Sequence, residues 1–131
     1  MVTSYNAKDC TITVNNAYLT GLGEDMVTGE KDEEFFESET GAQGDTVVNE
    51  KNDDKGTITI TLQATSPQNA MMISLAKSRA YFPIWVTNKS LGERFGGTSA
   101  RVKKYPEFAE GATAGDREYE IAVFDYTVDS I

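Results

Sequence analysis

The side chains that could do chemistry are mainly carboxylates, because the sequence contains no histidine and a single cysteine. The absence of histidine excludes His-based acid–base catalysis and His-ligated metal sites. Glu33, Glu34, Glu37 and Glu39 lie within seven residues and could include a catalytic carboxylate pair. Such a pair requires two environments that push the two pKa values apart, and nothing in the local sequence supplies them. We therefore interpret this segment as a solvated acidic face.

Other possible sites lack the spacing that their chemistry requires. Residues 49–56 are acidic enough for a calcium loop but lack the D-x-[DN]-x-[DN]-G spacing and the later glutamate. Gly21-x-Gly23 has no third glycine at the dinucleotide-binding distance. Cys10 has apolar neighbours in an alternating segment and is expected to be a small core residue. The sequence therefore predicts no enzyme, and no cofactor or metal.

Length and charge set further limits. A chain of 131 residues predicts one domain. The net charge is −9, and all of it lies in residues 1–65, which carry 13 acids and 4 bases. Such a surface repels nucleic acid. No apolar run is long enough to span a membrane, and residues 1–6 do not resemble a signal peptide.

The clearest element is a strand over residues 56–62, where Ile58, Ile60 and Leu62 alternate with threonines. Ser66 is placed to cap a helix and Pro67 to occupy its first turn, so a helix is expected from about 67 to 78. Its apolar face is drawn from residues 71–76.

The remaining segments predict further strands. Asn15-Asn16 suits a two-residue turn between strands at 10–14 and 17–19, and Gly21 is expected to open a loop. Residues 33–40 and 46–50 are expected to form a hairpin around a turn at 41–45. Strands are also expected at 84–87, 93–104 and 117–128, with an extended arm at 1–9 and exposed loops at 51–55 and 107–116. The predicted fold is mainly β with one α-helix.

The order of these segments resembles the tail tube protein of contractile-tailed bacteriophages, in the small-tube family also found in prophages and phage-tail-like bacteriocins. The matching segments cover nearly the full length: Thr11–Asn15 with Leu19–Gly21, Glu33–Phe36 followed by Gly41–Gly44, Gly56–Leu62, Ser66–Asn69, Phe82-Pro83 and Arg117–Tyr119. None of them is a chemical signature by itself, so the resemblance depends on their order and spacing.

The resemblance implies a β-sandwich or barrel flanked by a helix, as a single tail-tube-like domain over residues 1–131. It also implies six-membered rings that stack into a hollow tube inside a contractile sheath, and hairpins that join edge to edge into a barrel around the lumen. The partners implied are further copies of the chain, the sheath protein, and baseplate and tail-terminator proteins, with DNA passing through without binding. The location implied is a virion or phage-tail-like particle assembled in the bacterial host cytoplasm, with no membrane insertion.

Candidate positions follow from that resemblance. Glu33, Glu37 and Glu39 are the lumen-facing candidates, although a shift of one residue would expose Glu34, Ser38 and Thr40 instead. The candidates for contacts between subunits or rings are Lys51, Asn52, Asp53, Asp54, Lys55, Phe108 and Glu110.

Three alternatives stay open from the sequence. The first is a monomeric acidic β-sandwich module that binds cations or carbohydrate. The second is a secreted ring protein of a contractile secretion system. The third is a tube that belongs to a headless bacteriocin and conducts ions instead of DNA.

Overall fold

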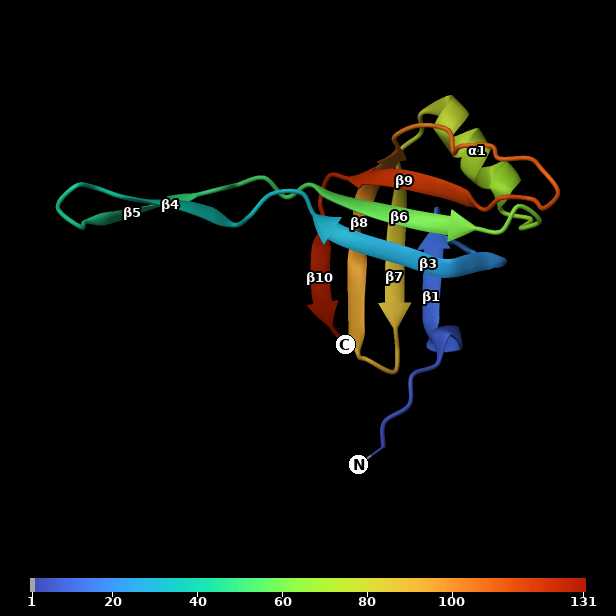
Figure 1. The fold of residues 1–131 in the computed structure, drawn as a ribbon, viewed down its shortest axis with the longest axis horizontal. Coiled ribbons are helices and arrows are strands. Elements are labelled where there is room, and N and C mark those ends of the chain that lie inside the picture. Colours follow the sequence, from blue (N-terminus) through green and yellow to red (C-terminus); the bar gives the residue numbers. More distant parts are fainter. Residues whose placement is uncertain (1) are drawn as a thin grey trace.

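The computed structural model describes residues 2–131, so Met1, the first residue of the arm expected at 1–9, lies outside the described part. Eight strands of the described part form one antiparallel sheet in the order β2-β1-β7-β8-β9-β6-β3, in which β10 pairs with β8, and the other two strands pair only with each other. This sheet folds over into two layers, whose strands cross at a steep angle in Figure 1. The first layer holds β1 (Cys10–Val14), β2 (Ala17–Tyr18), β7 (Phe82–Asn88), β8 (Glu93–Val102) and β10 (Thr127–Ser130); the second holds β3 (Leu22–Lys31), β6 (Gly56–Leu62) and β9 (Arg117–Val123). The fold is therefore an orthogonal β-sandwich, as the mainly β prediction required.

Strand β8 joins the two layers. Its first part pairs with β10 and its last part, Ala100 to Val102, pairs with β9. Within β8, Gly96 has φ +147, and a Cβ there would overlap the carbonyl oxygen of Ile84. Only glycine adopts this backbone conformation without strain.

The core lies between the layers and comes from alternate residues of the strands. Ile58, Ile60 and Leu62 of β6 are fully buried, and the intervening threonines are half-buried on the other side. Tyr119 and Ile121 of β9 are buried against them. The alternation predicted for β6 is thus confirmed, and burial of this apolar surface is the main stabilising contribution.

The helix α1 spans Asn69–Ser78 and covers one end of the sandwich, with Met72 fully buried (Figure 1). The predicted start at Pro67 with Ser66 as cap is wrong. The Ser66 hydroxyl donates instead to the carbonyl oxygen of Thr20 at 2.5 Å, and Asn69 Nδ2 donates to the carbonyl oxygen of Gln63 at 2.9 Å. A contact 46 residues away therefore uses the hydroxyl that local spacing assigned to capping.

The strands differ most from the prediction at three places. Gly21 has φ +67 but is followed directly by the ten-residue strand β3, where a loop was expected. The hairpin strand expected from residue 33 begins at Phe36, as β4 (Phe36–Thr40), and it pairs with β5 (Thr46–Glu50). The single closing strand expected at 117–128 is two strands, β9 and β10. The chain turns between them at Asp125, which accepts hydrogen bonds from the backbone N–H groups of Thr98 and Ser99.

The turn at Asn15 and Asn16 has positive φ at both residues, as predicted. Strand β7 lies inside the first layer between β1 and β8, in agreement with its apolar sequence. Among residues 2–131, no helix is long and apolar enough to cross a membrane.

Candidate assembly surface

The most prominent surface feature is the hairpin arm, which we define as residues 36–50. Figure 1 shows that the arm projects away from the two layers in line with β3 and β6. All ten residues of β4 and β5 are exposed, and β4 pairs only with β5. A two-stranded hairpin with no further packing is only marginally stable in water. Both of its outer edges carry unpaired backbone groups that can extend a sheet in another molecule.

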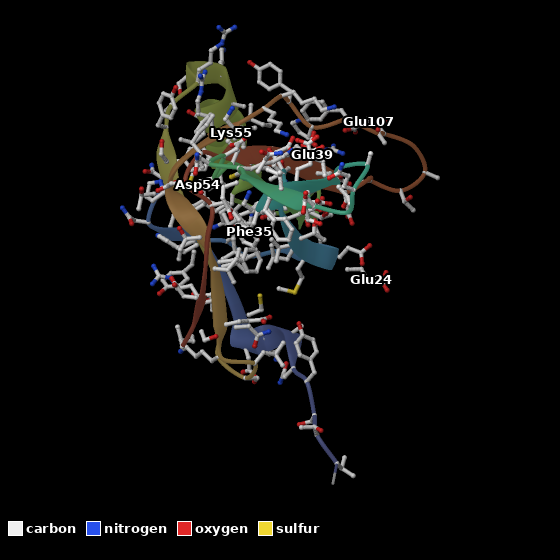
Figure 2. All side chains as sticks on the ribbon, turned by 90° about the vertical axis from the view of Figure 1, so that its left-hand side faces the viewer. Glu24, Phe35, Glu39, Asp54, Lys55 and Glu107 are labelled. Atoms are coloured by element: carbon white, nitrogen blue, oxygen red, sulfur yellow. The ribbon has the colours of Figure 1, made fainter. Side chains whose placement is uncertain are left out.

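The two faces of the arm have different chemistry. Glu37 pairs with Asn49 and Glu39 pairs with Val47, so these side chains share one face, on which the amide of Asn49 donates to Glu39 at 3.3 Å. The opposite face carries two apolar side chains, three hydroxyl side chains and one carboxylate: Phe36, Val48, Ser38, Thr40, Thr46 and Glu50. The register thus places Glu37 and Glu39 on the same side, as the sequence predicted. Figure 2 looks along the arm, with Glu39 in the upper part of the view.

Glu33 lies outside the paired strands, in a segment we call the neck (residues 32–35 and 51–55). Its carboxylate lies 3.3 Å from Lys51 Nζ, and the Glu37 carboxylate lies 3.9 Å from the same nitrogen. The hydrogen bond to Glu33, together with the negative charges of Glu33 and Glu37, raises the pKa of Lys51. Lys51, expected to contact a neighbouring subunit, therefore pairs within its own chain and offsets part of the acidic charge.

Lys31 joins the two sides of the neck. Its ammonium group donates to the carbonyl oxygens of Glu33 at 2.8 Å and Asp53 at 2.7 Å, and it lies 5.2 Å from the ring centroid of Phe35. The backbone N–H of Asp32 also donates to the carbonyl oxygen of Lys55 at 3.0 Å. The direction of the arm is thus fixed by bonds across the neck.

The other expected contact residues lie in two places. Asn52, Asp53, Asp54 and Lys55 form the second side of the neck, and Phe108 and Glu110 lie in the loop before β9. Glu110 Oε1 accepts from Arg117 Nη2 at 2.6 Å, and the Arg117 guanidinium lies 5.0 Å from the Phe108 ring centroid. The structure therefore does not bring the two groups together. In Figure 2 Asp54 and Lys55 lie on one side, and Glu107, next to Phe108, lies on the other.

A polar surface that the sequence analysis did not select covers the outer face of the second layer. Thr59 pairs with Thr28 on one side and with Glu120 on the other, and Thr61 pairs with Glu118, so these five side chains share one face. The signal was present in the alternation of Glu118 and Glu120 with the buried Tyr119 and Ile121. These two glutamates are less densely spaced in the sequence than the glutamates of the arm, so the sequence analysis did not select them.

The sheet also has open edges within the described residues. β3 and β2 end the strand order and pair on one side only, and β10 pairs only with β8. Edges of this kind are available for pairing with another chain.

Burial, together with the nearby charge of Glu93, raises the pKa of the Cys10 thiol, which disfavours the reactive thiolate. Among residues 2–131, no three Cys, Asp or Glu side chains come close enough together to hold a metal ion.

Comparison with solved structures shows the fold. The chain superposes on a chain of the cryo-EM structure of the anti-feeding prophage cap (AFP tube terminating cap) with a TM-score of 0.71 and 10% identity, covering 100% of this chain and 95% of the other. It superposes on a chain of the sheath-tube complex of an extracellular contractile injection system, PVC, with a TM-score of 0.72 and 10% identity, covering 98% and 93%. A chain of a native gene transfer agent virion gives 0.60 and 12% identity, covering 98% and 99%. No family model matches the sequence, and no curated protein matches it.

Proposed function

We propose that this chain is a structural subunit of the inner tail tube of a contractile phage tail or phage-tail-like particle. In this proposal six copies form a ring, and rings stack into a hollow conduit. The observation that carries the proposal is the full-length fold likeness to chains from contractile injection systems. The proposal assigns no catalytic activity and no cofactor.

The exposed arm and open edges support an assembling subunit over a monomeric binding module. A monomer would leave the apolar side chains of the arm in water and its backbone edges unpaired. In a ring, each subunit pairs its open edge with a different surface of the next subunit, and the same rotation repeats this contact until the ring closes. No edge is then left unpaired. In the proposed tube the arms and the second layer together form the barrel around the lumen.

The acidic face of the arm and the outer face of the second layer line the lumen in this proposal. Sixfold symmetry would turn Glu37, Glu39 and Glu120 into rings of charge. A phosphate ~10 Å from one carboxylate is repelled by about 0.4 kcal/mol in water before screening. Salt weakens this over roughly 8 Å. Many weak repulsions would let DNA pass without binding; in a headless particle the same lumen would conduct ions.

The remaining partners are the sheath, the baseplate and the tail terminator, and the particle would be assembled in the bacterial host cytoplasm. Arm-to-arm pairing would bring the neck residues Asn52 to Lys55 close to a neighbouring copy. Phe108 and Glu110, in the loop held to Arg117, are proposed to contact the next ring, as is the N-terminal arm.

A terminator subunit is the second candidate. The titles of two similar structures name an AFP tube terminating cap and a PVC sheath/tube terminator. A terminator would form single rings that cap a tube and stop its growth, whereas a tube subunit would add ring upon ring.

Negative-stain electron microscopy of the purified protein over a concentration series, with light scattering alongside, tests the proposal. Tubes of uniform width support the tube subunit, and single rings that never stack support the terminator. A monomer at every concentration, even with a preformed tail tip added as nucleus, contradicts both. Calcium and glycan titrations would then test the binding module.

The lumen assignment has its own test. Glu37→Lys/Glu39→Lys reverses the proposed rings of charge but leaves the opposite face of the arm unchanged. We expect tubes of normal width and slower DNA release from particles that contain the variant, measured by dye fluorescence after ejection is triggered. Reversal of an acid outside the proposed lumen, Asp129→Lys, is the control. Release at the wild-type rate from the Glu37/Glu39 variant would contradict the lumen assignment.

A further inference from the structure

A basic groove lies at one edge of the second layer, although the chain as a whole is strongly acidic. Its volume is about 560 Å³, and it is bounded by the end of α1, the end of β8 and the end of β9. Five of the 12 cationic residues in the sequence line this groove: Lys77, Arg79, Arg101, Lys103 and Lys104. No acidic side chain lines it, and its apolar wall includes Val102, Ala122 and Phe124.

Contacts within the chain do not account for this concentration of charge. Lys103 Nζ lies 4.0 Å from Glu120 Oε1, but the other four cations have no carboxylate at ion-pair distance among residues 2–131. Lys77 and Arg79 also complement the C-terminal end of the α1 dipole. Arg101 packs over the Tyr81 ring, 5.0 Å from its centroid. Several like charges around one groove repel each other, so an acidic occupant would be favourable.

The opposite edge of the same layer has the complementary charge. Strand β3 is unpaired on its outer side, and it exposes Glu24, Asp25 and Glu30. In Figure 1 β3 and β9 lie on opposite sides of β6, with α1 near the β9 side. Figure 2 shows Glu24 extending away from the body on the side away from α1. One molecule thus carries a basic groove and an acidic open edge at opposite ends of one layer.

We propose that the basic groove receives the β3 edge of a second copy of this chain. The contact is head to tail, and because both surfaces lie on one layer it repeats by the same rotation from copy to copy. This inference rests on the proposed function, because it identifies the contact that joins neighbouring subunits within a ring. The hairpin arm is a less suitable occupant of the groove. It extends in the direction of β3 and β6, whereas the groove and the β3 edge lie on opposite sides of the layer, across that direction (Figure 1).

Zero-length cross-linking of an equal mixture of ¹⁴N- and ¹⁵N-labelled protein tests which surfaces meet. A carbodiimide joins only amines and carboxylates that are in contact, and mass spectrometry identifies links between differently labelled copies. We expect links from Lys103 or Lys104 to Glu24 or Asp25. Links between copies that involve only the glutamates of the arm, or no links between copies at all, would overturn the proposal.

Charge reversal tests whether the contact drives association. The groove variant Arg101→Glu/Lys103→Glu and the edge variant Glu24→Lys/Asp25→Lys should each weaken association at least tenfold by analytical ultracentrifugation. An equal mixture of the two variants should recover it, because each reversed surface then meets a complementary one. Lys89→Glu, an exposed reversal in the turn between β7 and β8, is the control.

The outcomes separate the two proposals. If the wild type forms tubes and the reversals have no effect, or the mixture does not recover, the groove inference fails while the tube function stands. If the mixture recovers association but only open chains form, the contact stands and the tube function fails. If the groove variant instead abolishes binding to duplex DNA that the wild type binds, the groove is a nucleic-acid site and the inference is overturned.

Discussion

The face of the hairpin arm that carries Phe36 and Val48 gives the sharpest test of assembly. We expect the double substitution Phe36→Thr/Val48→Thr to leave the subunit folded but to prevent it from joining others. Phe36 is 52% exposed and Val48 is 51% exposed. Threonine has a high strand propensity, so the hairpin itself should be little affected. The substitutions reduce the apolar area that would be buried against a neighbouring subunit.

The magnitude follows from the exposed area. A Phe side chain has roughly 200 Å² of surface, so about 100 Å² remains to be buried in a partner. At ~25 cal/mol per Å² this is worth about 2.5 kcal/mol. Half-burial of Val48 adds about 1 kcal/mol. The sum of ~3.5 kcal/mol is a loss of roughly 300-fold in the association constant of each contact.

The assay compares the concentration at which rings or tubes first appear, by light scattering and electron microscopy, for variant and wild type. Thermal unfolding of the unassembled variant should occur within ~2 °C of the unassembled wild type, because both side chains lie outside the core. Val47→Thr is the matched control, since Val47 is 55% exposed on the acidic face of the same strand pair. Assembly of the double variant at the wild-type concentration, or an equal loss in the control, would refute the reasoning.

Three further predictions concern stability, measured by chemical denaturation of the unassembled protein. Gly96→Ala should lower the free energy of unfolding by about 2–4 kcal/mol, because it strains the backbone and meets Ile84, whereas Gly111→Ala, which meets nothing within 4 Å, should change it little; equal effects would contradict the role given to Gly96. Burial alone would raise the pKa of Asp125, but hydrogen bonds from the Thr98 hydroxyl and from the backbone N–H groups of Thr98 and Ser99 outweigh this and lower the pKa. Its stabilising contribution is therefore full above the unfolded-state pKa and is lost as pH falls through the folded-state pKa. Asp125→Asn should lower the free energy of unfolding at pH 7 and flatten its pH dependence below the unfolded-state pKa of Asp, and an unchanged acid profile would be the contrary result. Tyr119→Phe should cost about 1–2 kcal/mol, because the buried hydroxyl donates to Asn69 Oδ1 at 2.9 Å; a cost near zero would mean that water replaces this bond.

Local sequence patterns predicted those elements whose conformation is determined by neighbouring residues in the chain. Alternation located β6 because Ile58, Ile60 and Leu62 all enter the core. The Asn15-Asn16 pair located its turn because asparagine tolerates positive φ. The hairpin was found from the turn-rich tip between its two strands.

The elements that were missed depend on distant partners. β3 contains Gly23, Glu24 and Asp25, which favour a loop locally, and β6 pairs with Leu22 and with residues 27–31 on either side of an irregular segment. The break at Asp125 arises from bonds to residues 26 and 27 positions earlier in the chain.

The candidate site was predicted only in part, for the same reason. The glutamates of the arm are contiguous in sequence and were found. The basic groove was not found, because its cations are spread over residues 77–104 and meet only when α1 packs beside the end of β8. The net charge of each half of the chain did not indicate these cations, because residues 66–131 are neutral overall.

The neck has a mechanical consequence. With a rise of roughly 3.3 Å per residue, the arm reaches about 23 Å from Phe36 to its tip at Gln43, so it behaves as a lever pivoting at the neck. A tilt of about 10° would move the tip by ~4 Å, which is close to the ~4.8 Å spacing between neighbouring strands. The ammonium group of Lys31, bonded to carbonyl oxygens on both sides of the pivot, therefore sets the stiffness on which strand-to-strand alignment at the far end depends.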